Sequence, residues 1–278
     1  MKFPLGKMSV GDVLDRGLKL LFARLPVFYA INLMVLAPVL VLALAVPFLV
    51  DVARPEAAIG GLLALGLAAL LCVVVLQPIG TAAILHIIMQ EYRGKSASIG
   101  DALSFAFTRF GALLGTSILV GVLVVVGFIC CIIPGVYLYV SYIFVAQVVV
   151  LERLSGGAAL GRCQKLIEGH RGRVFGVVLL VLIGGKLVET GVDKGLEAVL
   201  PPVKVVAAAD GPRPEVSVPN YLINTLAGGL VQILFSTYAA VCTTLLYLDV
   251  RIRKEGFDLE LAAGGDEGAS PRDAEDRW

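Results

Sequence analysis

Charged residues are scarce in this chain, and histidine is scarcer still. Asp, Glu, Lys and Arg make up 16% of the 278 residues, against about 25% in a typical soluble domain. The two histidines, His86 and His170, belong to no HExxH motif, and the chain contains neither a GxSxG elbow nor a glycine-rich phosphate loop. No carboxylate lies at the centre of an apolar run. We therefore expect a protein that is not an enzyme and that uses no metal or cofactor.

Cysteine is also sparse, and its pattern excludes the usual roles. The five cysteines are Cys72, Cys130, Cys131, Cys163 and Cys242. They contain no CxxC pair, and four of the five lie within or beside apolar runs. We interpret them as small core residues, not as metal ligands or a disulfide framework. The net charge of +1 provides no basic field, so we expect no nucleic-acid partner.

Hydrophobic residues are abundant instead, at 58% of the chain with a mean hydropathy of +0.90. Several apolar runs reach the length of about 20 residues that crosses a bilayer. The sequence predicts an all-α polytopic membrane protein with one membrane domain over 1–260 and a disordered acidic tail over 261–278. Its six predicted transmembrane helices lie at about 25–50, 57–88, 111–133, 136–151, 174–190 and 221–248.

Three short amphipathic segments precede the first, third and fifth of these spans. The first begins at Ser9, a residue type that caps helix N-termini, with an acid three residues later. Similar segments begin at Ser98 and Ser155. The pattern has two interpretations: a threefold repeat of an amphipathic helix followed by a transmembrane hairpin, or convergence, since most helix starts favour serine and aspartate.

Basic residues on these segments and after the last span predict contacts with lipid head groups. An amphipathic helix beside a span is expected to lie in the membrane interface. The alternative for the amphipathic segments is a helix packed on its own protein. For the basic residues after span 6 it is a plain stop-transfer cluster. The acids in that last segment, Asp249 and Glu255, also have the charge to pair with the basic loops. The predicted lipid-contacting residues are Arg16, Lys19, Arg24, Arg162, Lys165, Arg251, Arg253 and Lys254.

The distribution of positive charge predicts the orientation. If both termini lie on one side of the membrane, that side carries 18 of the 23 Lys and Arg residues. Cytoplasmic loops carry the excess of Lys and Arg. We therefore expect the termini and all three amphipathic helices to lie in the cytoplasm.

Five amides interrupt the apolar runs: Asn32, Gln77, Gln147, Asn224 and Gln232. They are candidates to line a cavity, because polar groups in a span are costly and often functional. The alternative is that they hydrogen-bond between helices as packing contacts. Two local features complete the prediction, a tight turn over 131–135 and a small hairpin around Asp210-Gly211.

Three motifs resemble a known family: VLDRGL (13–18), IPGVYL (133–138) with VVLE (149–152), and LYLDVRIRKEGFDLE (246–260). They are similar to a bacterial family of six-span membrane proteins related to the membrane domain fused to some glycerophosphoryl diester phosphodiesterases. The resemblance implies the fold and a bacterial cytoplasmic (inner) membrane, without a catalytic domain, and it leaves the function open.

Two function classes follow from these observations. The first is a non-enzymatic scaffold or lipid-associated envelope component that acts through its interfacial helices. The second is a transporter or lipid-handling protein with a cavity between the helical hairpins. The intramembrane amides are sparse and uncharged, whereas a transporter needs convergent polar groups at the midplane. We therefore expect the first class, with membrane lipids and other membrane or envelope proteins as partners.

Overall fold

The computed structural model describes residues 8–49, 55–92, 98–199, 204–208, 211–215 and 218–256. These residues are almost entirely helical, with one small two-stranded sheet. Six helical segments in this described part are long and apolar enough to cross a membrane. The predicted class, an all-α polytopic membrane protein, is therefore confirmed. The predicted acidic tail lies outside the described residues.

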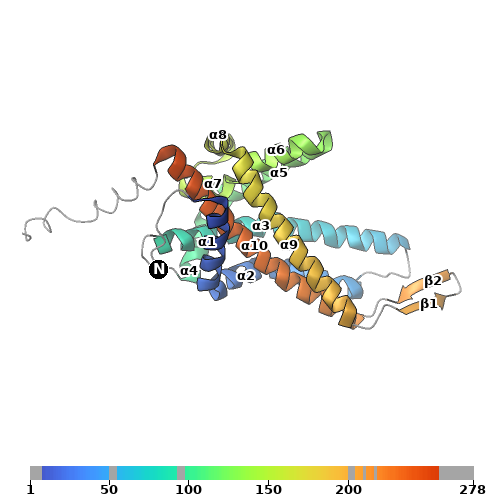
Figure 1. Cartoon of the computed structure of the whole chain (residues 1–278). Coiled ribbons are helices and arrows are strands. Elements are labelled where there is room, and N and C mark those ends of the chain that lie inside the picture. Colours follow the sequence, from blue (N-terminus) through green and yellow to red (C-terminus); the bar gives the residue numbers. More distant parts are fainter. Residues whose placement is uncertain are drawn as a thin grey trace, which may run out of the picture.

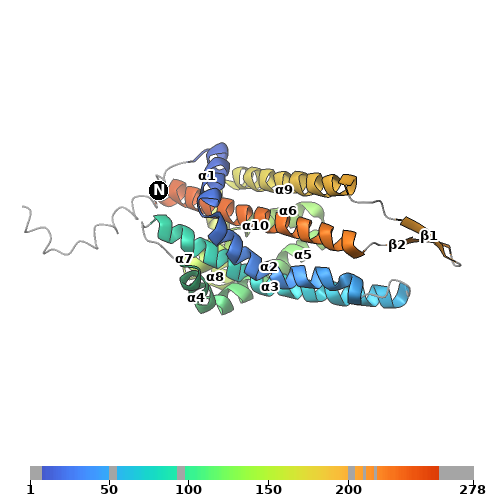
Figure 2. The same cartoon turned by 90° about the horizontal axis from the view of Figure 1, so that it is seen from below.

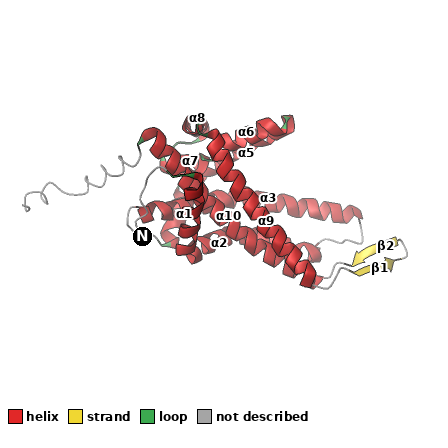
Figure 3. Cartoon of the chain, in the orientation of Figure 1, coloured by secondary structure: helices red, strands yellow, loops and turns green. Residues whose placement is uncertain are grey.

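The order of the elements repeats three times (Figure 3). An amphipathic helix, α1 (Val10–Ala23), precedes the spans α2 (Leu25–Leu49) and α3 (Pro55–Tyr92). The second amphipathic helix, α4 (Ile99–Thr108), precedes α5 (Phe110–Cys130) and the broken span made of α6 (Ile132–Ser141) and α7 (Val145–Leu151). The third, α8 (Gly156–Ile167), precedes α9 (Arg171–Val199) and α10 (Val218–Glu255).

The three amphipathic helices gather at one end of the molecule. Figures 1 and 2 show α1, α4 and α8 at the end where α10 finishes, with α1 running across the direction of the long helices. The strands β1 (Lys204–Ala208) and β2 (Gly211–Glu215) lie at the opposite end. This arrangement is the one expected of surface helices that lie along one membrane face.

The buried core also lies toward the amphipathic end. In α3 the residues from Ile79 to Met89 are mostly buried, whereas Leu62, Leu63 and Leu67 in its outer half are exposed. The side chains of Phe144 and Tyr247 are both fully buried and meet edge to face, with ring centroids 5.7 Å apart. Apolar exposure in the outer halves is typical of helices that face lipid, where no hydrophobic force drives them together.

A glycine lets α1 cross α10 closely. A Cβ atom at Gly17 would lie 2.7 Å from Sγ of Cys242 and 3.3 Å from the ring of Tyr238. The Tyr238 hydroxyl donates to the backbone oxygen of Leu14 at 3.1 Å. Any larger residue at position 17 would push the amphipathic helix away from the last span.

The described helices depart from the predicted bounds at several ends. The turn expected over 131–135 consists of one residue, Cys131, whose backbone is extended. It is this short because α6 already begins at Ile132. Pro134 fits inside the first turn of α6, where its missing N–H has no helical partner in any case. Helix α9 continues to Val199, past the expected end near 190, with the ion pairs Lys186–Glu189 and Lys194–Glu197 on its outer half.

The predicted hairpin is present as an antiparallel pair. Lys204 pairs with Glu215 and Ala208 with Gly211, and Pro212 and Pro214 both lie in β2. Proline tolerates a strand only at an edge, and both strands of a two-stranded sheet are edges. This explains why the prolines do not prevent the hairpin.

Candidate binding cavity

The five predicted amides have three different environments in the structure. Gln77, Gln147 and Gln232 line cavities between the long helices. Asn32 is buried and donates from Nδ2 to Oγ of Ser236 at 3.0 Å and to Oγ1 of Thr237 at 2.7 Å, so it joins α2 to α10 as a packing contact. Asn224 lines neither of these cavities.

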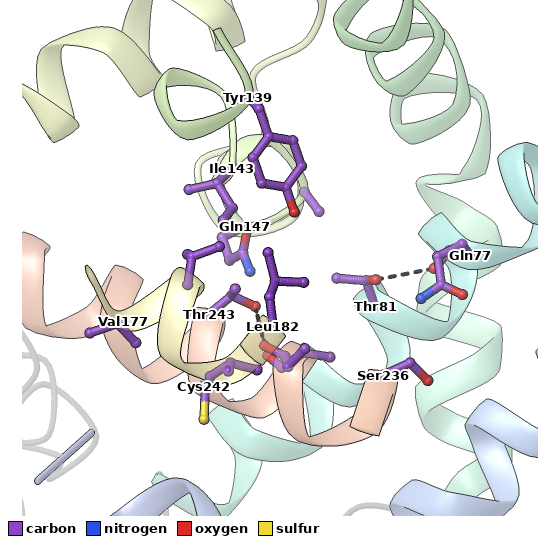
Figure 4. Close-up of a pocket in the computed structure, with 15 residues that line it drawn as sticks. Gln77, Thr81, Tyr139, Ile143, Gln147, Val177, Leu182, Ser236, Cys242 and Thr243 are labelled. Atoms are coloured by element: carbon purple, nitrogen blue, oxygen red, sulfur yellow. Dashed lines mark hydrogen bonds between the residues drawn. The ribbon is translucent and has the colours of Figure 1, made fainter. Parts of the chain in front are cut away.

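We call the first space the Gln147 cavity; its volume is about 270 Å³. Helices α3, α6, α7, α9 and α10 all contribute to its wall, and no charged side chain does. Figure 4 shows Tyr139 and Gln147 reaching into it from one side, with Thr81, Ser236 and Thr243 on the facing wall. Its lining is Gln77, Thr81, Tyr139, Ile143, Ala146, Gln147, Val177, Val178, Val181, Leu182, Ser236, Ala239, Ala240, Cys242 and Thr243.

Two amide side chains in the wall of this cavity have oxygens without a hydrogen-bond partner in the described part of the chain. Gln147 is 1% exposed, and its Oε1 and that of Gln77 are buried without a hydrogen bond among the described residues. The nearby hydroxyls are already donating: Thr81 to the backbone oxygen of Gln77 at 3.1 Å and Thr243 to that of Ala239 at 2.8 Å. A buried acceptor left unpaired is unfavourable, so the Gln77 and Gln147 amides are the polar groups of this wall that would gain most from a hydrogen bond to a ligand.

A second space, the Gln232 cavity, lies farther from the amphipathic end and has a volume of about 580 Å³. Residues of α2, α3, α9 and α10 line it, including Gln232, Thr225 and Glu189. Gln77 and Ser236 line both cavities. The two spaces therefore meet at this pair of side chains and follow the same side of α10.

The Gln147 cavity borders a break in the fourth span. Helix α6 ends at Ser141 and α7 begins at Val145, with Ile143 of the intervening turn in the cavity wall. The turn has few helical hydrogen bonds, although Val145 N–H donates to the Tyr142 oxygen at 3.0 Å. Non-helical backbone at membrane depth is tolerated where it is buried in protein or lines a cavity. No proline or glycine lies at this break, so the sequence does not predict it.

The basic residues predicted to contact lipid head groups lie at the amphipathic end, and several are engaged within the protein. Arg24 pairs with Glu91 at 3.0 Å, and Arg253 pairs with Asp249 at 3.0 Å. Lys19 pairs with Asp15 on an exposed face of α1. Lys254 donates to the backbone oxygen of Lys165, and Arg251 pairs with Glu255 at 3.3 Å. Arg16, in α1, lies on the same helix as Lys19.

Arg162 is the centre of one ion-pair network. Its guanidinium lies 2.5 Å from Glu152 and 2.5 Å from Glu255, and the Tyr247 hydroxyl donates to Glu152 at 2.9 Å. Glu255 first and then Glu152 raise the pKa of Arg162 above its ordinary value. Burial raises the pKa of the adjacent Cys163 thiol to about 12. This thiol therefore stays protonated, as expected for a small core residue.

Asp249 is the centre of a second network. It is fully buried and accepts from the backbone N–H of Met8 at 2.7 Å, while Arg173 lies 3.1 Å away. Arg173 and Arg253 both donate to the backbone oxygen of Met8. The expected pairing of Asp249 and Glu255 with the basic segments is thus confirmed. The contact with Met8 has no signal in the sequence, because it joins residues 241 positions apart.

The described residues contain no group of three His, Cys, Asp or Glu side chains that is suited to a metal ion. Comparison with protein-family models, curated proteins and solved structures found no match to this chain. The resemblance to the membrane domain of the phosphodiesterases therefore stays a prediction.

Proposed function

We propose that this integral membrane protein binds an uncharged, hydroxyl-bearing lipid in the Gln147 cavity and handles it within the bilayer. The observation that carries the proposal is the pair of amide side chains, Gln77 and Gln147, that line one cavity and whose buried oxygens have no hydrogen-bond partner among the described residues. Binding and release need no covalent step. The resemblance leads us to propose a bacterial inner membrane, and the charge asymmetry leads us to propose that the termini lie in the cytoplasm.

The lining of the cavity favours this class of ligand. An amide offers both an acceptor oxygen and a donor nitrogen, and a hydroxyl is the neutral group that satisfies either. The remaining wall is mostly aliphatic and carries no charge. An ionised head group would lose its hydration there without a counter-charge, whereas an alkyl or acyl chain would be accommodated.

The wall that the two cavities share at Gln77 and Ser236 supports movement of the lipid between them over binding at one fixed place. The Gln147 cavity and the larger Gln232 cavity share these two side chains in their walls, so a ligand could move between neighbouring spaces. Both cavities lie among spans instead of at an aqueous surface, so a lipid can enter from the bilayer. By contrast, Arg24, Arg162 and Arg253 are engaged with carboxylates of the protein, which weakens the scaffold interpretation based on free basic faces.

The test is binding of a fluorescent diacylglycerol to the purified protein in detergent micelles. We expect the double variant Gln77→Leu/Gln147→Leu to bind at least about tenfold more weakly, because it loses two neutral hydrogen bonds. The variant should keep its thermal midpoint, since leucine removes two buried amide oxygens that have no hydrogen-bond partner among the described residues.

Gln90→Leu is the matched control. Gln90 lies on the same helix as Gln77, and its Oε1 is also buried and unpartnered, but it lines neither cavity. Its substitution should leave diacylglycerol binding unchanged. Equal binding by wild type and the double variant, or equal competition by phosphatidylglycerol, would show that the amides do not select a neutral lipid.

A further inference from the structure

Arg171 is a cation without a carboxylate partner among the described residues. It is the first residue of α9, and its guanidinium carbon lies 4.7 Å from the centroid of the Tyr137 ring on α6. Its Nε is buried and makes no hydrogen bond in that part of the chain. The neighbouring Arg173 differs, because it pairs with Asp249.

A groove of about 320 Å³ lies beside this arginine. Its walls come from α6 and the first turns of α9, and apart from Arg171 and the Tyr137 hydroxyl they are apolar. The lining consists of Ile133, Val136, Tyr137, Val140, Arg171, Gly172 and Phe175. None of these residues lines the Gln147 or Gln232 cavity, so the groove is a separate site.

The position of Arg171 makes an unpaired charge costly. Tyr137 is on a transmembrane segment, and the Arg171 guanidinium stacks on its ring, so the charge lies beside the span. Ionisable groups at such positions are expensive unless a counter-charge meets them. Stacking on a ring uses the face of the guanidinium. Because Nε is buried, the N–H donors of the two terminal nitrogens are the groups that a phosphate can meet in the guanidinium plane.

We propose that this groove binds one anionic phospholipid, with its phosphate on the Arg171 guanidinium and an acyl chain along Val136, Val140 and Phe175. The lipid belongs to the leaflet that faces the amphipathic helices, because α9 begins at that end (Figure 1). The phosphate supplies the missing counter-charge, and the apolar wall selects a lipid over a free phosphate. This site is charged, whereas the cavity of the proposed function is neutral.

Native mass spectrometry of the full chain in detergent tests the site with two lipids of identical acyl chains. Phosphatidylglycerol should bind at least about tenfold more tightly than phosphatidylcholine, and Arg171→Gln should remove that preference through the loss of charge-assisted hydrogen bonds. Arg153→Gln is the matched control. Arg153 is exposed at the same end of the molecule and lines none of the three cavities, so its loss should leave the preference intact.

A second variant, Val136→Trp, fills the groove and keeps Arg171. It tests whether the lipid binds in this groove even if Arg171→Gln fails to fold. We expect it to weaken phosphatidylglycerol binding by about tenfold. Displacement of phosphatidylglycerol by millimolar inorganic phosphate would identify a free-anion site and overturn the proposal. Unchanged lipid preference in Arg171→Gln, or unchanged binding in Val136→Trp, would overturn it equally.

Discussion

Asp249 connects three distant segments through one buried carboxylate. Its oxygens meet the Met8 N–H, Arg173 and Arg253, so the start of α1, the start of α9 and the end of α10 are fixed together. A buried charge is tolerated when hydrogen bonds and counter-charges surround it. The two arginines retain about a fifth of their side-chain exposure, at 21% and 24%, whereas the carboxylate has none.

We predict that Asp249→Asn destabilises the protein strongly, because it leaves two partly buried guanidinium groups without their counter-charge. Breaking a buried ion pair costs about 3 to 5 kcal/mol. The thermal midpoint of the purified protein in detergent measures the effect. Asp15→Asn is the control, since it breaks a pair with Lys19 whose side chains are 58% and 63% exposed. Similar midpoints for the two variants would contradict the proposed role of Asp249.

At the residue scale, the sequence identified the amides that could line a cavity, but it did not predict which of them lie together in one. All five intramembrane amides were candidates, yet Asn32 bonds to its neighbours while Gln77 and Gln147 line a common cavity. The difference depends on how α3 and α7 are rotated about their axes. The break after Ser141 sets the orientation of α7, and no proline or glycine marks it. Tertiary packing therefore decides the geometry of the cavity.

At the scale of the elements, the helices α1 and α4 both begin with a capping box, whereas α8 does not. Ser9 and Asp12 form a reciprocal capping box, and so do Ser98 and Asp101. The corresponding Ser155 makes no side-chain cap bond, and the third residue of α8, Ala158, has no carboxylate that could complete a capping box. The sequence could show all three helix starts and their common spacing. It could not show that the third start depends on other contacts.

The capping aspartates are also linked to pH. Hydrogen bonds from the Ser9 backbone and side chain lower the pKa of Asp12 below its ordinary 3.8, and the Ser98 side chain and backbone lower that of Asp101. A carboxyl whose pKa is lower in the folded state stabilises the fold above its unfolded value. That contribution is lost as the pH falls from about 3.8 through the lowered pKa.

We predict that Ser98→Ala loosens the start of α4, since one backbone N–H loses its acceptor. Hydrogen exchange of the first-turn amides should rise roughly fivefold at neutral pH. The same substitution at Ser155 serves as the control and should leave exchange in α8 unchanged. If both variants behave alike, the capping box does not hold the helix start.

At the scale of the whole molecule, the two ends differ in both packing and charge. The amphipathic end contains α1, α4, α8, both ion-pair networks and most of the buried core, while the other end has the small hairpin and largely exposed helices (Figures 1 and 2). Hydropathy was sufficient to predict six spans, because span length is fixed by the bilayer. The dense packing at one end was not predictable, since it arises from contacts between residues far apart in the chain.

This asymmetry supports a prediction about orientation. Of the 23 Lys and Arg residues, 18 belong to the end with the amphipathic helices if the chain crosses six times, and such excess stays in the cytoplasm. Two exposed positions report on the two ends: Arg153, just after α7, and Lys194, whose side chain is 71% exposed near the end of α9. In a background with Cys130 and Cys131 replaced by alanine, Lys194→Cys should react with a membrane-impermeant maleimide on intact cells. Arg153→Cys should react only after permeabilisation. The reverse pattern would contradict the predicted orientation, because it would place the ion-pair networks and the excess of Lys and Arg outside the cell.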